Sequence, residues 1–342
     1  MAENMLAYKL RVLSGARWSN FMIAIDRAQE VCHWSRLKIA LDMIRCHFKY
    51  GSGYNDYSIF HFYELTDKQK DTYLNRYRNK LFVTQMNDEN YAHFFDNKNE
   101  FYHKFRDYLG REFVDLETDS KEDVIKFFDS HDRIFCKIKD GSCADGAELL
   151  YTKDFEDGEA FYNYVMGKNL CVLEDVLENH PAIKEIYPYA LNCLRVVTLI
   201  GDDGTPHILG AFEKFGREGR FVDVFGIHGP VNLRTGKLDF PLHRGDTLTN
   251  GLFYEHPDTH KQLVGFEIPL FKETMQCALR AAMVVPQMRY IGWDIAVTPN
   301  GPAIIEGNHY SSMDYFQLPG QSDKKIGLIP RIKKFCPSFQ YK

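Results

Sequence analysis

The segment from Ile291 to Asn308, IGWDIAVTPNGPAIIEGN, constrains the fold more than any other stretch because it specifies a β-hairpin. Apolar residues alternate with small or polar residues on both sides of Pro299-Asn300-Gly301, which is the pattern of two strands joined by a turn. A two-residue Asn-Gly loop would place prolines at both flanking positions, where backbone N–H donors are needed. We therefore predict a three-residue loop with Gly301 in the left-handed position.

The predicted register places Asp294 opposite Glu306, with Asn308 one step further along the face of Glu306. Carboxylates so placed repel each other by up to about 4 kcal/mol at roughly 4 Å, so a cation should neutralise them. Aspartate, glutamate and asparagine oxygens are ligands that suit Mg²⁺. The alternative is a solvated hairpin face whose charges avoid each other. The same register predicts three further features: Thr298 opposite Pro302, Ala296 opposite Ile304, and an apolar face of Ile291, Trp293, Ile295, Val297, Ala303 and Ile305.

Length and composition limit the class of protein. A chain of 342 residues is long enough for at least two domains or subdomains. The net charge of −5 and the absence of a Lys/Arg stripe argue against nucleic-acid binding. The eight cysteines show no zinc spacing, which favours reduced thiols in a cytoplasmic protein. We expect no signal peptide or membrane span at the amino end, since charged residues interrupt its apolar stretches.

The first 50 residues have apolar residues at helical spacing, as in Leu37, Leu41 and Ile44, and predict two helices. An aromatic and basic group within them allows two interpretations. The group could contact a membrane interface, but packing into a core is the favoured interpretation. Its apolar members are Trp18, Phe21, Met22 and Trp34.

The next part of the chain predicts helices over 67–80 and 95–109, and Ser120 with Asp123 forms a capping-box pattern for a helix to Asp129. A strand over 133–139 carries Lys137 and runs into the Gly141–Gly146 segment. Glycines and small residues after a strand lysine could let backbone N–H groups approach a phosphate, although Asp-Gly is also an ordinary turn. We expect Lys137 to bind phosphate rather than to support the fold.

The second half of the chain predicts mostly strands, over 170–176, 192–200, 208–214 and 221–225. A glycine-bearing loop at 226–230 and a helix at 270–284 follow, before the hairpin. Arg195 lies inside an apolar strand, where an arginine needs an anionic partner. It is a candidate catalytic and substrate-binding residue, and His228 and Gly229 are further candidate substrate contacts.

Four segments together resemble the ATP-grasp superfamily, and most closely its sugar-transfer-associated branch. They are GWDIAV…GPAIIEGN at 292–308, NCLRVVTL at 192–199, LEDVLENHP at 173–181 and HPDT…GFEIP at 256–269. The resemblance covers roughly residues 90–310 and implies an α+β fold in which two subdomains clasp ATP. We accordingly expect a helical region at 1–90, subdomains at 91–176 and 177–310, and a C-terminal extension at 311–342.

The resemblance also implies roles for individual residues. Asp294, Glu306 and Asn308 would bind Mg²⁺, two ions being expected and Mn²⁺ a possible substitute, with Glu306 bridging the ions. Lys98 and Lys137 would lie beside the phosphates, and Gly141, Ser142 and Gly146 would belong to the phosphate loop. The adenine would meet the hinge of Glu174, Asp175 and Val176, and Glu178 or His180 would reach the ribose.

Many ATP-grasp ligases have an arginine two residues before the first metal aspartate, but this chain has Gly292 there. Arg195 is therefore the better candidate for stabilising the transferred group, and Lys137 is a second catalytic candidate. The leading hypothesis is an ATP-dependent ligase that joins a carboxylate and an amine through an acyl phosphate, with a sugar acid or surface-polysaccharide precursor as one substrate. A small-molecule kinase and a nucleotide-binding module without turnover are the alternatives. The oligomeric state stays open.

Overall fold

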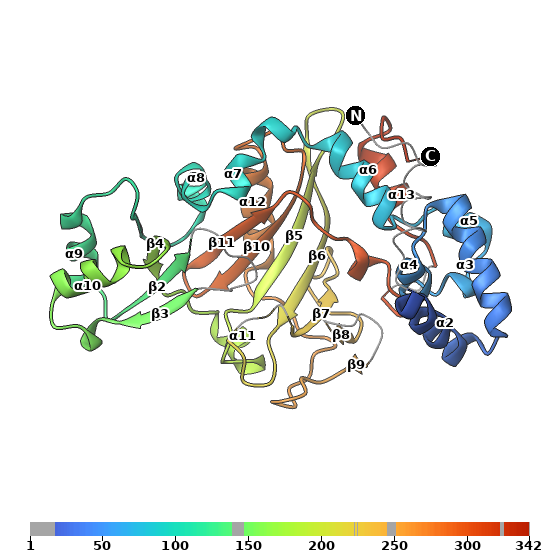
Figure 1. Cartoon of the computed structure of the whole chain (residues 1–342), viewed down its shortest axis with the longest axis horizontal. Helices are drawn as coiled ribbons and strands as arrows, with labels where there is room; N and C mark the ends of the chain where they lie inside the picture. The colour runs from blue at the N-terminus through green and yellow to red at the C-terminus, as the bar shows by residue number, and fades with distance from the viewer. Residues whose placement is uncertain are drawn as a thin grey trace.

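The computed structural model describes residues 18–138, 147–221, 223, 225–244, 251–321 and 325–341. Three parts follow one another along its long axis (Figure 1). A group of helices from the first part of the chain forms one end, a seven-stranded sheet forms the middle, and a smaller four-stranded sheet forms the other end. The predicted α+β class with a helical N-terminal region is confirmed.

The N-terminal helices begin and end where the sequence provides caps. Ser35 accepts a hydrogen bond from the Lys38 amide at the start of α3, and Gly51 ends that helix at φ 72°. The helix predicted over 67–80 is instead two helices, because Asn75 caps a new helix by accepting a bond from the Arg78 amide. The helices are α2 (Trp18–Cys32), α3 (Arg36–Tyr50), α4 (Tyr54–Ile59), α5 (Asp67–Lys70) and α6 (Arg76–Met86).

The two helices predicted within the first 50 residues are thus present as α2 and α3. Phe21, Met22 and Trp34 pack partly buried against the N-terminal core, as the favoured interpretation expected, but Trp18 is 72% exposed. The buried face of α3 carries Ile39 and Met43 rather than the residues whose spacing predicted the helix. Leu37, Leu41 and Ile44 lie on the exposed side.

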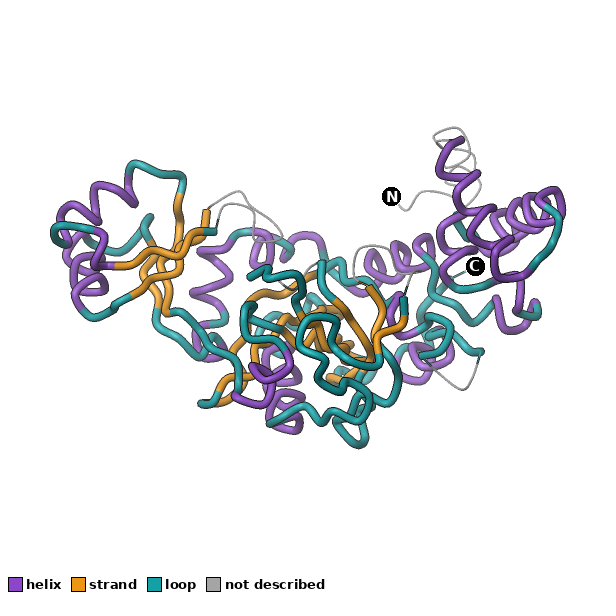
Figure 2. Tube along the Cα trace, turned by 90° about the horizontal axis from the view of Figure 1, so that it is seen from below, coloured by secondary structure: helices purple, strands orange, loops and turns teal. Residues whose placement is uncertain are grey.

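The smaller sheet has the strand order β1-β4-β2-β3 and is packed against two helices, α9 and α10 (Figures 1 and 2). The predicted capping box of α9 is present, since Ser120 and Asp123 each bond the other's backbone amide. The helix predicted over 95–109 is broken into short pieces. The elements are α7 (His93–Asp96), α8 (Lys98–Lys104), β1 (Phe113–Asp115), α9 (Lys121–Asp129), β2 (Arg133–Ile138), β3 (Glu148–Tyr151), α10 (Gly158–Met166) and β4 (Leu170–Asp175).

The central sheet is antiparallel, with the order β11-β10-β5-β6-β7-β8-β9. The loop predicted at 226–230 is largely a strand, β7, and residues 221, 223 and 225 lie outside any strand, so both of those predictions were wrong. The elements are α11 (Pro181–Ile186), β5 (Cys193–Ile200), β6 (Pro206–Phe215), β7 (Ile227–Pro230), β8 (Leu242–Arg244), β9 (Leu252–Phe253), α12 (Phe271–Ala282), β10 (Tyr290–Thr298), β11 (Gly301–Asn308) and α13 (Ile329–Phe335).

The hairpin of β10 and β11 has a different turn from the predicted one, yet it keeps the pairing of its acids. Thr298 pairs with Gly301, so the loop has two residues, not three. A β-bulge after Asp294 leaves Ile305 without a partner on β10. Asp294 is therefore opposite Glu306, as predicted. The bulge therefore turns Ile304 rather than Ile305 into the core.

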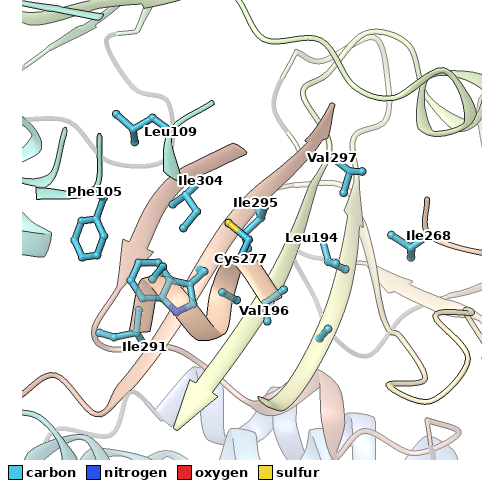
Figure 3. Close-up of a cluster of buried hydrophobic side chains, with 14 of the residues drawn as sticks. Phe105, Leu109, Leu194, Val196, Ile268, Cys277, Ile291, Ile295, Val297 and Ile304 are labelled. Carbon is cyan, nitrogen blue, oxygen red and sulfur yellow. The ribbon is translucent and has the colours of Figure 1, made fainter. Parts of the chain in front are cut away.

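One face of the central sheet forms the largest apolar core, shown in Figure 3. Trp293, Ile295 and Ile304 pack there with Cys277 of α12. Fully burying side chains of this size contributes about 1.5–3 kcal/mol each, so this face fixes the strand register. The opposite face packs Val197, Leu199 and Tyr290 into a second apolar core and carries polar groups further along the same strands.

Two further properties concern only the described ranges. None of their helices combines the length and the apolar character needed to cross a bilayer. The cysteines of these ranges are all free, and the reduced state of the thiols stays a prediction.

Candidate active site

A row of charged side chains crosses the polar face of the central sheet. Asp294 on β10 pairs with Glu306 on β11 at one side and with Arg195 on β5 at the other. Three neighbouring strands thereby bring the two predicted metal-binding acids and the predicted catalytic arginine together. Arg195 and Asp294 are 99 residues apart in the sequence, and only the strand order makes them neighbours.

Asp294 is buried and neutralised by two cations. Arg195 donates from both Nε and Nη2 to the two carboxylate oxygens, the second bond measuring 2.7 Å. The ammonium of Lys214 lies 3.2 Å from Oδ2. Burial alone would raise the pKa of Asp294, but the charges of Arg195 and Lys214 outweigh it and hold this pKa below its usual range. Asp294 is therefore ionised at neutral pH.

Glu306 lies on the solvent side of this row. Partial desolvation, and after it the charge of Asp294, raise its pKa. Asn308 donates from Nδ2 to Glu306 Oε1 at 3.1 Å, so these two side chains lie in direct contact. Among the described residues no three His, Cys, Asp or Glu side chains gather as a metal site. The donor set of two carboxylates and one amide nevertheless suits Mg²⁺, which needs few protein ligands.

Lys214 is a site residue that the sequence analysis missed. It lies on β6 and bridges Asp294 and Asp223, whose Oδ2 is 3.3 Å from its ammonium. Asp223 also accepts a bond from the Cys193 amide at 3.1 Å. The available signal was a lysine near the end of a predicted strand that is mostly apolar, since a lysine buried there needs an anionic partner.

A second buried cluster joins the smaller sheet to the central one. Lys137 lies 3.2 Å from Glu174 and donates to the Tyr102 hydroxyl at 2.6 Å. Arg111, also missed from sequence, donates to Glu174 at 2.6 Å and to the Ile304 carbonyl at 2.8 Å. The Glu174 pKa is lowered, because Arg111 and Lys137 outweigh the effect of burial. Lys137 thus has a structural contact that the sequence did not indicate.

Lys98, the other predicted phosphate lysine, lies at the start of α8. Burial raises the pKa of the Cys171 thiol to about 11, and the charges of Lys98 and Lys137 both oppose that rise. Both lysines therefore act on the same residue of β4, and their shared phosphate role stays a prediction.

The other predicted nucleotide contacts have structural partners of their own. Glu178 pairs with Arg133 and, at 3.0 Å, with Lys184, and His180 Nδ1 accepts a bond from the Ala182 amide at the start of α11. Asp175 accepts a bond from the Glu112 amide at 2.8 Å, and Val176 follows β4 half-buried. Their nucleotide roles stay predictions. Gly141, Ser142 and Gly146 lie outside the described residues.

His228 and Gly229 lie on β7. His228 is buried, its Nε2 is 2.9 Å from the Asp223 carbonyl oxygen, and burial lowers its pKa to about 3, so it is neutral. It pairs with Lys214 across β6 and β7, at the end of the charged row. A side chain on Gly229 would meet Leu242 at 2.7 Å, so this glycine has a packing role. Substrate contact by either residue stays a prediction.

The N-terminal helices hold the segment that follows β11. Asn79 on α6 donates to the Ser311 carbonyl at 3.1 Å, and Asn87 donates to the carbonyls of Tyr290 and His309, both at 2.9 Å. The Ser311 hydroxyl in turn accepts a bond from Arg195 at 3.4 Å. The helical region is therefore connected to the charged row through Ser311.

The apolar face of the same sheet contains one carboxyl group that has no partner among the described residues. Glu213 on β6 is fully buried, neither of its carboxylate oxygens is hydrogen-bonded, and burial raises its pKa to about 8. It is therefore largely protonated at neutral pH, whereas in the unfolded chain it titrates near 4.3.

Replacing Glu213 with glutamine should remove a pH dependence of stability. The folded protein holds this proton up to about pH 8, so wild-type stability falls as pH rises from about 4.3 to 8. Near pH 9 we expect Glu213→Gln to be more stable than wild type by roughly 3–5 kcal/mol, with little difference near pH 4. Urea unfolding across this range measures it, with exposed Glu267→Gln as the control. Parallel stability curves for wild type and Glu213→Gln would contradict the assignment.

Comparisons with known proteins identify relatives of the chain. The family model described as sugar-transfer associated ATP-grasp matches residues 136–337. No curated protein matches in sequence.

Similar solved structures include the ATP-grasp ligase PsnB with minimal precursor, Mg and ADP, at 16% identity and TM-score 0.42 over 73% of this chain and 60% of that one. The D-alanine–D-alanine ligase of Bacillus anthracis has 13% identity and TM-score 0.36 over 66% of this chain and 58% of that one. The N5-carboxyaminoimidazole ribonucleotide synthetase of Thermotoga maritima has 13% identity and TM-score 0.36 over 63% and 42%. This chain therefore spans less than two thirds of each.

Proposed function

The chain belongs to the sugar-transfer associated ATP-grasp family, and from that premise we propose that it is an ATP-dependent ligase joining a carboxylate to an amine. The observation that carries the proposal is the charged row of the central sheet. Asp294 and Glu306 lie side by side next to Arg195, with Lys214 bound to the same aspartate. This row combines acids that suit a metal with cations that suit a phosphate.

Asp294, Glu306 and Asn308 would hold Mg²⁺, two ions being expected, and Mn²⁺ would serve as a substitute. When bound, the metal would neutralise phosphate charge and orient the phosphates. A cation there would also relieve the repulsion between Asp294 and Glu306, which accounts in part for the raised pKa of Glu306. The raised pKa thus supports a cation site at this position.

The chain's own cations would act on the phosphoryl group. Lys214 is buried, Arg195 is partly buried, and both are bonded to acids, so they are held in place before substrate arrives. Fixed charges of this kind stabilise charge that develops in a transition state without reorganising. Lys137 on β2 of the smaller sheet and Lys98 on α8 would bind the phosphates. Water kept out of the site would spare an acyl phosphate from hydrolysis.

For the substrates we propose chemical classes. The family's association with sugar transfer supports a sugar acid or a surface-polysaccharide precursor as one partner, and an amino acid would supply the amine. A kinase, whose product is the phosphate itself, is the second candidate, because the same row would serve either acceptor. A module without turnover is the third, and the intact acid pair argues against it. The cytoplasmic location stays a prediction.

The test is a mass-spectrometric screen of amino acids and uronic acids with MgATP. We expect a condensation product whose mass equals the two substrates less one water, together with ADP and phosphate release that requires both substrates. A phosphorylated product formed without an amine would select the kinase. ATP binding without any turnover across the screen would favour the module.

Lys137→Met should weaken MgATP binding and also destabilise the protein. Loss of a phosphate contact should raise the apparent ATP constant about tenfold or more, and breaking the buried pair with Glu174 should cost about 1–3 kcal/mol. Calorimetric titration and urea unfolding measure the two effects. The control is Lys168→Met in the same part of the molecule. Lys168 forms a surface ion pair with Glu148, and such a pair contributes little to stability. Unchanged ATP affinity with reduced stability would leave Lys137 a structural residue only.

A further inference from the structure

Helix α3 presents a second apolar face that the fold does not cover. Leu37, Leu41 and Ile44 recur at the spacing of one helix face and are 70%, 59% and 40% exposed. The opposite face buries Ile39 and Met43 in the N-terminal core. We call Leu37, Leu41 and Ile44 the α3 stripe. Scattered exposed leucines are ordinary, but a continuous stripe on one helix indicates a contact surface.

The surroundings of the α3 stripe are basic, in a chain that is acidic elsewhere. Helix α3 itself contains four basic residues, Arg36, Lys38, Arg45 and Lys49, against one acidic residue, Asp42, a net charge of +3 in a chain whose total is −5. On α3, Lys38, Arg45 and Lys49 lie along one flank of the stripe, with Arg45 and Lys49 sharing Asp67. Lys38 lies 3.4 Å above the ring of Trp34.

Three partners could cover the α3 stripe: a second copy of the chain, residues 1–17, or an anionic surface. Their charges distinguish them. A symmetric contact with a second copy would bring two basic faces together, which is unfavourable. Residues 1–17 are themselves basic, with Lys9, Arg11 and Arg17 against Glu3. An anionic surface offers both the opposite charge and an apolar layer for the leucines, and interfacial helices carry this combination of leucine, tryptophan and basic residues.

We propose that the α3 stripe docks the protein on an anionic lipid surface. The α2–α3 end lies opposite the smaller sheet along the long axis (Figures 1 and 2), so docking leaves the smaller sheet and the charged row away from the lipid. The proposed ligase would then work beside a lipid surface, although the docking does not depend on that activity.

The test is co-sedimentation of the full chain with vesicles of phosphatidylcholine alone and of phosphatidylcholine mixed with phosphatidylglycerol. We expect binding to the mixed vesicles, little binding to phosphatidylcholine alone, and a weaker partition coefficient as salt rises. The double variant Leu37→Gln/Leu41→Gln should lower the partition coefficient at least about tenfold, because two buried leucines contribute more than that to transfer from water.

The matched control is Met166→Gln, a 48% exposed apolar residue at the end of α10 in the smaller sheet's part of the molecule, which should bind vesicles as wild type does. Thermal melting of each variant checks that the fold is kept. Equal binding by wild type and the double variant would overturn the proposal. So would a dimer, seen by light scattering, that the double variant abolishes, or vesicle binding that appears only after residues 1–17 are removed.

Discussion

Replacing Glu306 with glutamine is expected to abolish ATP turnover and weaken MgATP binding while the protein stays folded. Glutamine keeps the size and one oxygen of the side chain but removes the charge that a divalent cation requires. The loss should be at least about 10³-fold in kcat if this residue holds metal at the transferred phosphoryl group, comparable to removal of a major electrostatic contact. Turnover assays at several Mg²⁺ concentrations, together with calorimetric ATP titration, measure it.

The same variant has a second readout that does not depend on activity. Because desolvation and Asp294 raise the pKa of Glu306, its ionisation opposes folding above the pH at which it titrates in the unfolded chain, near 4.3. The glutamine variant should therefore be more stable than wild type by up to about 1 kcal/mol at neutral pH and no different at pH 4. Glu273→Gln on α12 is the matched control for both readouts. Wild-type turnover by the Glu306 variant would remove the metal assignment.

Replacing Arg195 should give the largest combined effect on stability and rate. Its guanidinium holds both oxygens of buried Asp294, so Arg195→Met leaves that carboxylate with Lys214 alone and should cost about 3–5 kcal/mol. Arg195→Lys should lose less stability but still lower kcat much more than MgATP affinity, since lysine keeps the charge without the planar fork. Urea unfolding, ATP titration and single-turnover rates on one preparation separate these effects.

The pH dependence of the same variants identifies the ion pair. Arg195 and Lys214 hold the Asp294 pKa below its usual range, so the stabilisation is fully present above about pH 4 and is lost as pH falls below that value. Arg195→Met should flatten this acid limb of the stability curve. Asp202 provides a control at the surface: the Ser338 amide and then Arg289 lower its pKa to about 2, and Arg289→Met should leave the Asp294 contribution intact. A normal single-turnover rate in destabilised Arg195→Lys would make the arginine structural and remove it from the proposed transfer step.

The sequence predicted much of the local structure because local rules decide it. The capping box of Ser120 and Asp123, the strand around Arg195 and the strand that carries Lys137 all follow from spacing within a few residues. The hairpin shows where such reasoning stops. Turn chemistry predicted a three-residue loop, but the structure has a two-residue loop and a bulge, which together reach the same pairing of Asp294 with Glu306. Packing of Ile304 into the core, which sequence spacing does not encode, decided between these solutions.

The sequence by itself therefore determined which local features were available. These are a hairpin with two acids, an arginine inside a strand, and a glycine-bearing turn after a strand lysine. Only the tertiary structure decided which of them meet. Strand order placed Arg195 beside Asp294 and Lys214 beside both, and the fold brought Lys137 and Arg111 to the same carboxylate, Glu174. It also left the α3 stripe outside the core. The physical reason is that local sequence patterns determine hydrogen bonding between residues close in the chain. The partners of a buried charge or an apolar face come from segments far away in the sequence, and local patterns do not identify them.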